Sequence, residues 1–174
     1  DLLTHINDYL VDILEHRRVD KVELDGSTKL LTTSTGERFS APALIVATGA
    51  SWRKLNVPGE ADYIGKGVAF CPHCDGPFYK GKHVAVVGGG NSGIEAAIDL
   101  AGICSKVTVL EFMDELKADQ VLQEKAKSLP NVEVFLHSQS LEVLGNGDKV
   151  TGLRVKDRKT DAERVIDLDG IFVQ

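Results

Sequence analysis

The sequence has few cysteines, no long apolar run and no excess of positive charge. Three Cys among 174 residues are too few for the disulfide framework of a small secreted protein. The longest nearly unbroken apolar stretch, residues 41–47, is far shorter than the roughly 20 residues of a membrane helix. A net charge of −6, from 20 Lys and Arg against 26 Asp and Glu, argues against broad electrostatic capture of nucleic acid or anionic membrane. Because 43% of the residues are apolar, the chain can bury a core, and we expect a soluble, cytoplasmic protein.

Glycine, by contrast, is abundant and unevenly placed. It supplies 17 of the 174 residues, about a tenth, against a typical share of about 7%. The glycines concentrate at Thr48-Gly49, at Cys74-Asp75-Gly76 and in the run Gly88-Gly89-Gly90-Asn91-Ser92-Gly93. Each place is a candidate for a turn or for a close approach of the backbone to a ligand.

The first 50 residues predict a small antiparallel sheet. Strands at 19–24 and 29–33 flank a turn at Gly26, and a second turn precedes Phe39. The apolar run 43–47 is typical of a strand that is buried on both faces. From residue 51 to about residue 66 the pattern loses its periodicity and gathers Pro and Gly, so we expect a connection between two domains there.

The rest of the chain predicts a Rossmann-like α/β domain with a β-meander. The expected order is strand 83–87, helix 91–103, strand 106–110, helix 118–129 and strand 132–136. Because strands joined by helices in this βαβαβ order run parallel, we expect a parallel sheet. Three strands near 141–144, 150–156 and 164–168 should form the meander, and residues 170–173 a last apolar strand.

The run from Gly88 to Gly93 matches the pattern G-x-G-x-x-G, which gains weight from its place between a predicted strand and a predicted helix. Gly88 suits a tight turn, Gly90 lets a pyrophosphate approach the backbone, and Gly93 lets the helix pack against the strand. The N–H groups at the start of the helix, at Asn91 and Ser92, would then face the phosphates. The alternative is a glycine turn that binds nothing.

Glu111 ends the second predicted strand of this domain, 18 residues after Gly93. A carboxylate in this place accepts hydrogen bonds from the adenosine ribose hydroxyls and repels a 2′-phosphate. No Arg or Lys follows before Lys117, although a phosphate clamp normally uses Arg. The sequence therefore predicts NADH rather than NADPH as the cofactor.

Cys71 and Cys74 form a C-x-x-C pair, which can close a disulfide ring or share a metal. Zinc needs about four ligands, and the nearby extra candidates are only His73 and His83, so we favour a redox pair and expect no metal. Asp75, directly after the second Cys, can pass a proton during thiol exchange. A pair of buried, unreactive thiols is the alternative. We interpret the isolated third cysteine, Cys104, as a residue that fills space in the core or at the surface and takes no part in the chemistry.

Together these motifs resemble the thioredoxin reductase family of flavoproteins, which are pyridine nucleotide-disulfide oxidoreductases. The resemblance rests on residues 46–50, 57–60, 71–77 and 88–93. Within that family, residues 71–77, 91–103 and Leu110-Glu111-Phe112 look most like the alkyl hydroperoxide reductase branch. Thioredoxin reductases proper usually carry basic residues after the second strand to hold NADPH, and this chain lacks them.

The resemblance implies a sequence of electron transfers. NADH on the glycine loop would reduce FAD, the flavin would reduce the Cys71–Cys74 disulfide, and the dithiol would pass electrons through a thioredoxin-like module to a peroxiredoxin subunit. Cys74 would face the flavin, Cys71 would attack the next disulfide, and Asp75 would be the acid. Thr48 and Gly49 would contribute to cofactor binding. The full-length protein would be a homodimer in which one domain rotates against the other, with residues 58–68 as one hinge strand.

The resemblance also implies that the chain carries part of this machinery. Residues 1–60 correspond to the middle of a split FAD-binding domain, and residues 61–174 to an NAD-binding domain that carries the redox cysteines. Because the family's FAD fingerprint and closing Gly-Asp segment are expected outside the chain, we expect it to be catalytically incomplete alone. Two other functions stay open: an NADPH-dependent thioredoxin reductase, and a non-catalytic module that binds NADH and senses redox state.

Overall fold

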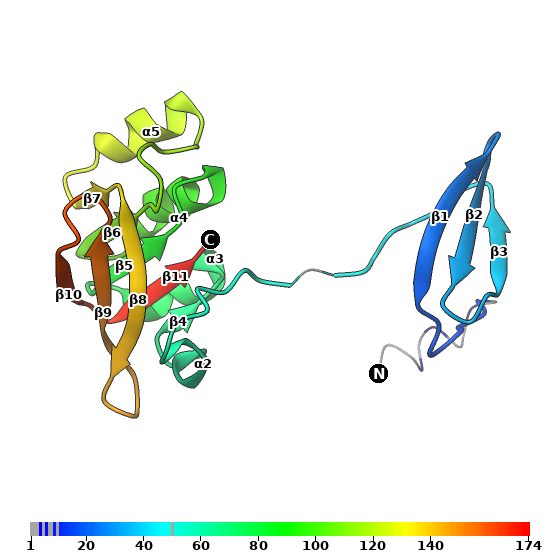
Figure 1. Cartoon of the computed structure of the whole chain (residues 1–174), viewed down its shortest axis with the longest axis horizontal. Helices are drawn as coiled ribbons and strands as arrows, with labels where there is room; N and C mark the ends of the chain where they lie inside the picture. The colour runs from blue at the N-terminus through cyan, green and yellow to red at the C-terminus, as the bar shows by residue number, and fades with distance from the viewer. Residues whose placement is uncertain (1–3, 5, 7–8, 10, 50) are drawn as a thin grey trace. The chain divides into compact units, whose positions relative to one another are not determined.

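The computed structural model describes residues 4, 6, 9, 11–49 and 51–174 (Figure 1). The chain divides into two compact units, Asp1–Ala50 and Ser51–Gln174. The division therefore falls about ten residues before the boundary expected from the sequence.

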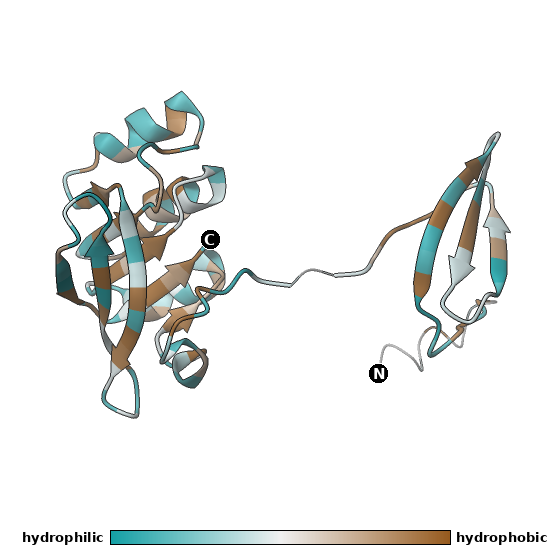
Figure 2. Ribbon diagram, viewed as in Figure 1, coloured by the Kyte–Doolittle hydropathy of each residue, from teal (hydrophilic) through white to brown (hydrophobic). Residues whose placement is uncertain are grey.

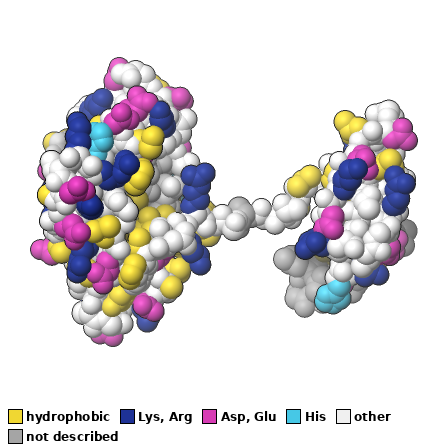
Figure 3. All heavy atoms as spheres, viewed as in Figure 1, with side chains coloured by type: hydrophobic (Ala, Val, Ile, Leu, Met, Phe, Trp, Pro, Cys, Tyr) yellow, Lys and Arg dark blue, Asp and Glu magenta, His cyan; other side chains and the backbone are white. Residues whose placement is uncertain are grey.

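None of the helices in the described residues is long and apolar enough to cross a membrane. On the face seen in Figure 3, positive and negative side chains are interspersed on both units.

The first unit contains a three-stranded antiparallel sheet in the order β1-β2-β3. Its strands are β1 (Val19–Asp25), β2 (Thr28–Thr33) and β3 (Arg38–Ala41). Gly26, with φ of 60°, makes the turn between β1 and β2, where Asp25 pairs with Thr28. The predicted hairpins are confirmed. Apolar residues of β1 are exposed, including Leu24 at 75%. Figure 2 shows hydrophobic and hydrophilic residues alternating in bands along the strands of this sheet.

The predicted strand at residues 43–47 is wrong for this structure. The segment has no regular secondary structure, and Ile45 and Val46 are 90% and 72% exposed. A strand buried on both faces needs neighbouring strands to take its backbone hydrogen bonds. Among the described residues no strand pairs with this segment, so its apolar side chains stay in solvent.

The second unit is built on a five-stranded sheet in the order β4-β11-β5-β6-β7, all of whose pairings are parallel. Two helices connect β5 to β6 and β6 to β7, which confirms the predicted βαβαβ order. The first helix ends two residues earlier than predicted, and the second is two residues shorter at each end. The elements are β4 (Val68–Ala69), β5 (His83–Val87), α4 (Asn91–Ala101), β6 (Lys106–Leu110), α5 (Gln120–Lys127), β7 (Val132–Phe135) and β11 (Gly170–Val173).

The two faces of this sheet pack against different layers, because successive side chains of a strand point in opposite directions. Val84 and Val86 of β5 pack with α4, whereas Ala85 between them packs with an antiparallel sheet on the other face. That second sheet is the predicted meander, in the order β10-β9-β8. Its strands are β8 (Ser138–Gly145), β9 (Val150–Asp157) and β10 (Glu163–Asp167). The unit therefore has a helix layer, a parallel sheet and an antiparallel sheet.

The stretch expected as a connection, residues 51–66, packs on the second unit instead. Glu60, at the start of α2 (Glu60–Tyr63), is only 3% exposed. Its carboxylate accepts backbone hydrogen bonds from Leu55 at 2.7 Å and Asn56 at 2.8 Å. The carbonyl of Pro58 accepts a hydrogen bond from the N–H of Val143 in the meander at 2.9 Å. Irregular backbone here reflects these specific anchors, which a search for periodicity does not detect.

Candidate active site

The glycine loop joins the end of β5 to the start of α4. Gly88 has φ of 128°, a conformation that side chains rarely adopt. A Cβ at Gly93 would run into the backbone carbonyl of Gly88, so the helix can approach the strand only because residue 93 is a glycine. A Cβ at Gly90 would meet nothing within 4 Å. Space is thus left open at the position where the motif expects a pyrophosphate.

The first hydrogen bond of α4 runs from the N–H of Ile94 to the carbonyl of Gly90 at 3.0 Å. The backbone N–H groups of Asn91 and Ser92 lie before that bond at the helix start, where they can donate hydrogen bonds to an anion. The side chain of Asn91 has another role. Its Oδ1 accepts from the N–H of Asp119 at 2.7 Å and its Nδ2 donates to Oδ2 of Asp119 at 3.1 Å, which joins the starts of α4 and α5.

Glu111 follows β6 and is buried, with 8% of its surface exposed. Its Oε2 accepts a hydrogen bond from the backbone N–H of Gly89 at 2.6 Å, and its Oε1 accepts one from Met113 at 2.7 Å. Each carboxylate oxygen can accept a further hydrogen bond. The residue that the sequence assigned to ribose binding therefore also braces the glycine loop.

Gly88 and Glu111 line one cavity of about 430 Å³ in the second unit. Val87, Leu110 and Val173, the last residues of β5, β6 and β11, line it too. In open α/β sheets, ligands bind outside the carboxyl ends of the parallel strands. The structure thus brings two of the sequence-predicted site residues together in the crevice where a dinucleotide is expected.

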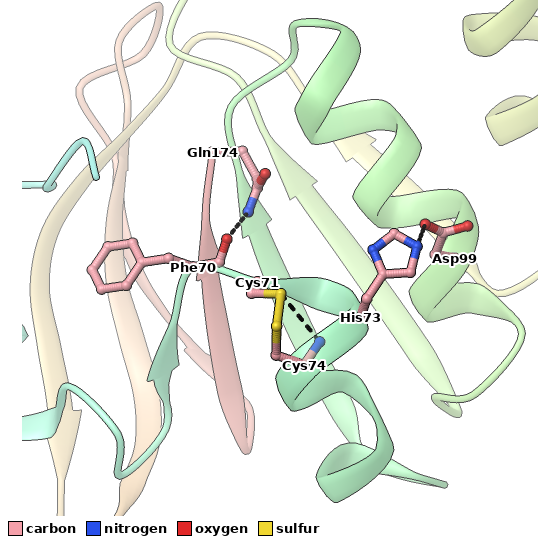
Figure 4. The surroundings of a disulfide bond; sticks show 6 residues. All are labelled: Phe70, Cys71, His73, Cys74, Asp99 and Gln174. Atoms are coloured by element: carbon pink, nitrogen blue, oxygen red, sulfur yellow. Dashed lines mark hydrogen bonds and ion pairs between the residues drawn. A yellow bond between two sulfur atoms is a disulfide. The ribbon is translucent and has the colours of Figure 1, made fainter. Parts of the chain in front are cut away.

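Cys71 and Cys74 form a disulfide with a Cα–Cα distance of 5.3 Å (Figure 4). They lie at the short helix α3 (Pro72–Asp75), where the N–H of Cys74 donates to Sγ of Cys71 at 3.2 Å. In the described part of the chain, no group of three or more His, Cys, Asp and Glu residues is placed to hold a metal. Cys104 is buried, and burial raises the pKa of its thiol to about 11.

The disulfide turn is attached to the dinucleotide part of the unit on two sides (Figure 4). His73 Nε2 lies 3.2 Å from Oδ2 of Asp99 on α4. Nε2 of Gln174, directly after β11, donates to the carbonyl of Phe70 at 3.0 Å. The turn that carries the cysteines is therefore linked to the same helix that begins at the glycine loop.

A second hollow, of about 550 Å³, lies beside Cys71. Asp75 lines it together with aromatic residues, among them Phe78, which is 74% exposed. Trp52 stacks on Phe70 on the same hollow, with ring centroids 5.9 Å apart. Asp75 is thus close to the cysteine pair, and its role as an acid stays a prediction.

Thr48 and Gly49 are not brought into either cavity. They are exposed residues of the first unit, whereas the other candidate site residues belong to the second. Their contribution to cofactor binding stays a prediction.

Sequence reasoning did not place three cations near Glu111 and Phe112. Arg53 and Lys54 line the cavity that contains Glu111. Arg158 places its guanidinium carbon 3.6 Å from the ring centroid of Phe112, directly after Glu111. No Arg or Lys closely follows Glu111 in sequence, but the structure places these three cations on its cavity or beside the next residue. No local pattern marks Arg158, since it arrives from the turn that follows β9.

A parallel α/β sheet with a glycine loop at its carboxyl edge and a disulfide linked to the next helix is the arrangement of a domain from a pyridine nucleotide-disulfide oxidoreductase, and the comparisons agree. The family described as "Pyridine nucleotide-disulphide oxidoreductase" matches residues 4–174, and the chain belongs to this family. It is 55% identical to the alkyl hydroperoxide reductase F subunit (Pseudomonas putida), over 98% of this chain and 33% of that protein. It is 52% identical to the protein of the same name from Escherichia coli (strain K12), over 99% of this chain and 34% of that protein. The resemblance found in the motifs is confirmed.

Solved structures support the fold class. The thioredoxin reductase from Giardia duodenalis matches with a TM-score of 0.84 at 30% identity, covering 91% of this chain and 52% of that one. The thioredoxin reductase from Streptococcus pyogenes matches with a TM-score of 0.75 at 36% identity, covering 90% and 51%. The predicted Rossmann-like α/β class is confirmed. The chain spans about a third of the length of the curated relatives it matches.

Proposed function

We propose that the chain supplies the pyridine-nucleotide site and the redox disulfide of an NADH-dependent, FAD-linked disulfide reductase that delivers electrons to a peroxiredoxin. The observation that carries the proposal is the attachment of both parts to α4. The glycine loop precedes this helix, and the contact between His73 Nε2 and Oδ2 of Asp99 links the cysteine turn to it.

The residues of the crevice fit a pyridine dinucleotide. Gly90 leaves room for a pyrophosphate, and the N–H groups at the start of α4 are suited to bind its oxygens. Glu111 can accept hydrogen bonds from the ribose hydroxyls while it holds Gly89 and Met113. The bound pyridine nucleotide would supply a hydride, and a flavin would be needed to relay its two electrons to the Cys71–Cys74 disulfide.

The cysteine pair supplies the exchange chemistry. In the reduced state the thiolate of Cys71 attacks a partner disulfide, and a mixed disulfide forms as one partner thiolate leaves. Cys74 then attacks Cys71, so the Cys71–Cys74 bond re-forms and the partner leaves with its second thiol. Two electrons and two protons pass to the partner. Asp75 lines the same hollow as Cys71 and directly follows Cys74, which makes it the proposed source of a proton.

We propose NADH rather than NADPH because Glu111 is a buried carboxylate at the ribose position. Arg158, which the structure places beside the residue after Glu111, is engaged with the ring and the carbonyl of Phe112. Comparing the dissociation constants of NADH and NADPH tests this choice, and equal values would contradict the role of Glu111.

For the first unit we propose the middle part of a split FAD-binding domain, with residues 61–174 forming the core of the NAD-binding domain. The exposed apolar residues Leu24, Ile45 and Val46 support this proposal, because such side chains are normally covered in a complete domain. On this view residues 43–47 become a strand when flavin-domain neighbours are present. Thr48 and Gly49 then lie at the end of that strand, near the flavin.

The electron acceptor is proposed to be a peroxiredoxin subunit, reached through a thioredoxin-like module, in a cytoplasmic homodimer. The two relatives described above carry the name of an alkyl hydroperoxide reductase, which supports a peroxide-linked acceptor. A cytoplasmic location agrees with a dithiol that is oxidised and reduced in each turnover.

Stopped-flow reduction of the disulfide tests the proposal. With a flavin domain added, NADH should reduce Cys71–Cys74 over repeated turnovers in the presence of a peroxiredoxin system, and Cys71→Ser should abolish this. NADH binding without turnover would instead support the redox-sensing module. Absorbance at flavin wavelengths provides a separate check, since the chain alone should purify without stoichiometric FAD.

A further inference from the structure

Phe112 has an unusual position for a large apolar side chain. One face of its ring lies against Arg158, whose guanidinium carbon is 3.6 Å from the ring centroid. Nη1 of Arg158 also donates to the carbonyl of Phe112 at 2.8 Å. Phe112 is nevertheless 47% exposed. The ring is therefore held by a flat cation on one side and is open to solvent elsewhere.

The backbone fixes Arg158 in this position. The N–H of His137 donates to the carbonyl of Met113 at 2.9 Å, and the N–H of Arg158 donates to the carbonyl of His137 at 2.8 Å. Oδ1 of Asp157 accepts hydrogen bonds from the N–H groups of Lys159 and Thr160, which closes the turn after β9. Arg158 is thus anchored by its main chain and by two contacts of its side chain.

Phe112 lines the same cavity of about 430 Å³ as Gly88 and Glu111. A dinucleotide with its pyrophosphate on the glycine loop and its adenosine ribose at Glu111 must place the base beyond that ribose. The next residue after Glu111 is Phe112. Purine bases stack readily on aromatic rings, and a cation on the opposite ring face holds the ring in place.

We propose that Phe112 and Arg158 form the platform on which the adenine of NADH stacks. Phe112 contacts the base, and Arg158 is a positioning residue that acts through the ring. This inference rests on the proposed binding of a pyridine dinucleotide in the crevice. It adds a specificity-determining pair contributed by segments far apart in the sequence.

The test measures binding of two nucleotides to the full chain. NADH contains the adenosine half, whereas reduced nicotinamide mononucleotide lacks it. Arg158→Ala should raise the dissociation constant of NADH about three- to tenfold and leave that of the mononucleotide unchanged. ADP-ribose, measured by competition, should lose affinity in parallel with NADH. Arg158→Lys, which keeps the charge and loses the planar group, should fall between wild type and Arg158→Ala.

A matched control is available in the same unit. Arg164 lies over the ring of Phe135 with 4.1 Å between its guanidinium carbon and the ring centroid, and neither residue lines the crevice. Arg164→Ala should therefore leave the NADH dissociation constant unchanged. Phe112→Leu keeps an apolar side chain and should weaken NADH binding. Adding Arg158→Ala to it should cause little further loss, because the two residues act as one unit.

Four outcomes would overturn the inference. NADH affinity could be unaffected by Arg158→Ala, or both nucleotides could be weakened by the same factor, which would indicate a general structural role. A larger loss for NADPH than for NADH would assign Arg158 to a 2′-phosphate instead. A wild-type chain without measurable NADH affinity would overturn the proposed function itself and this inference with it.

Discussion

Oε2 of Glu111 accepts a hydrogen bond from the backbone N–H of Gly89 at 2.6 Å, across 22 residues of sequence. The contact ties the glycine loop after β5 to the end of β6. Because Oε1 also binds the N–H of Met113, one buried carboxylate positions both segments. The proposed ribose site and the glycine loop therefore depend on the same side chain.

Replacing Glu111 by Gln should weaken both stability and NADH binding. The amide keeps one acceptor oxygen, so one of the two backbone N–H groups loses its partner and faces a donor. We expect a loss of about 1–3 kcal/mol in the free energy of unfolding, measured in urea. Glu115→Gln is the control, since Glu115 is an exposed residue paired with Lys117 and should change stability by less than about 1 kcal/mol. Equal effects of the two substitutions would contradict the bracing role.

Alanine at Gly90 and alanine at Gly93 should have different consequences. At Gly93 the new Cβ would collide with the Gly88 carbonyl, so the loop must move and both the melting temperature and NADH affinity should fall. At Gly90 the Cβ meets no protein atom, so the melting temperature should hold while NADH affinity falls. Thermal unfolding and NADH titration of both variants check this. Unchanged NADH affinity in Gly90→Ala would place the pyrophosphate elsewhere.

The three cysteines should differ in reactivity once the disulfide is reduced. Burial raises the pKa of the Cys104 thiol to about 11, so little thiolate is present at pH 8. Iodoacetamide at pH 8 should modify Cys71 and Cys74 in the folded chain and Cys104 only after unfolding. Mass spectrometry of the digested protein distinguishes these sites. Rapid modification of folded Cys104 would contradict its buried environment.

Stability should fall as the pH drops below about 6.5, with His83 contributing. Burial lowers the pKa of His83 in the folded chain below its ordinary 6.5, while Nε2 lies 2.9 Å from the hydroxyl of Thr108. As the pH falls, His83 takes up a proton in the unfolded chain before it does so in the folded chain. Its contribution to the free energy of unfolding is therefore fully present above the unfolded pKa and is lost as the pH falls through the folded pKa. Urea unfolding at pH 7.5 and 5.5 measures the loss.

The variant His83→Gln isolates this contribution. It should lose less stability between pH 7.5 and 5.5 than the wild type, because glutamine does not titrate. The charged groups that act on His83, chiefly Lys106, Glu133 and Asp169, are unchanged in the variant. An identical pH dependence in both proteins would show that His83 carries no part of it.

Local patterns were sufficient for most of the second unit. The strands of the βαβαβ core and the meander follow from periodicity and turn residues, and the glycine loop follows from its motif. The position of β11 between β4 and β5 could not be predicted in this way, because pairing between distant strands is decided by packing of both sheet faces. The strand expected at 43–47 failed for a related reason, since burial of a strand depends on neighbours.

In the candidate site, too, the residues of local motifs were predicted and those that meet only in the folded chain were not. The C-x-x-C pair and the glycine loop are each confined to a few residues of sequence and were found from their spacing. Arg158 acts on Phe112 from a turn 46 residues further along the chain, so only the three-dimensional structure places it there. The hydrogen bonds of Glu111 to Gly89 and Met113 were not predicted, because the motif already assigned this carboxylate to ligand binding.

The place of β11 between β4 and β5 has a consequence for biosynthesis. Phe172 pairs with Ala69 and Val86, so the sheet joins segments separated by about a hundred positions. Until residues 170–173 leave the ribosome, β4 and β5 have no strand between them, and their unpaired edges are open to other chains. Such long-range pairing also slows folding. Nascent chains of this sequence should therefore depend on chaperones until β11 is inserted.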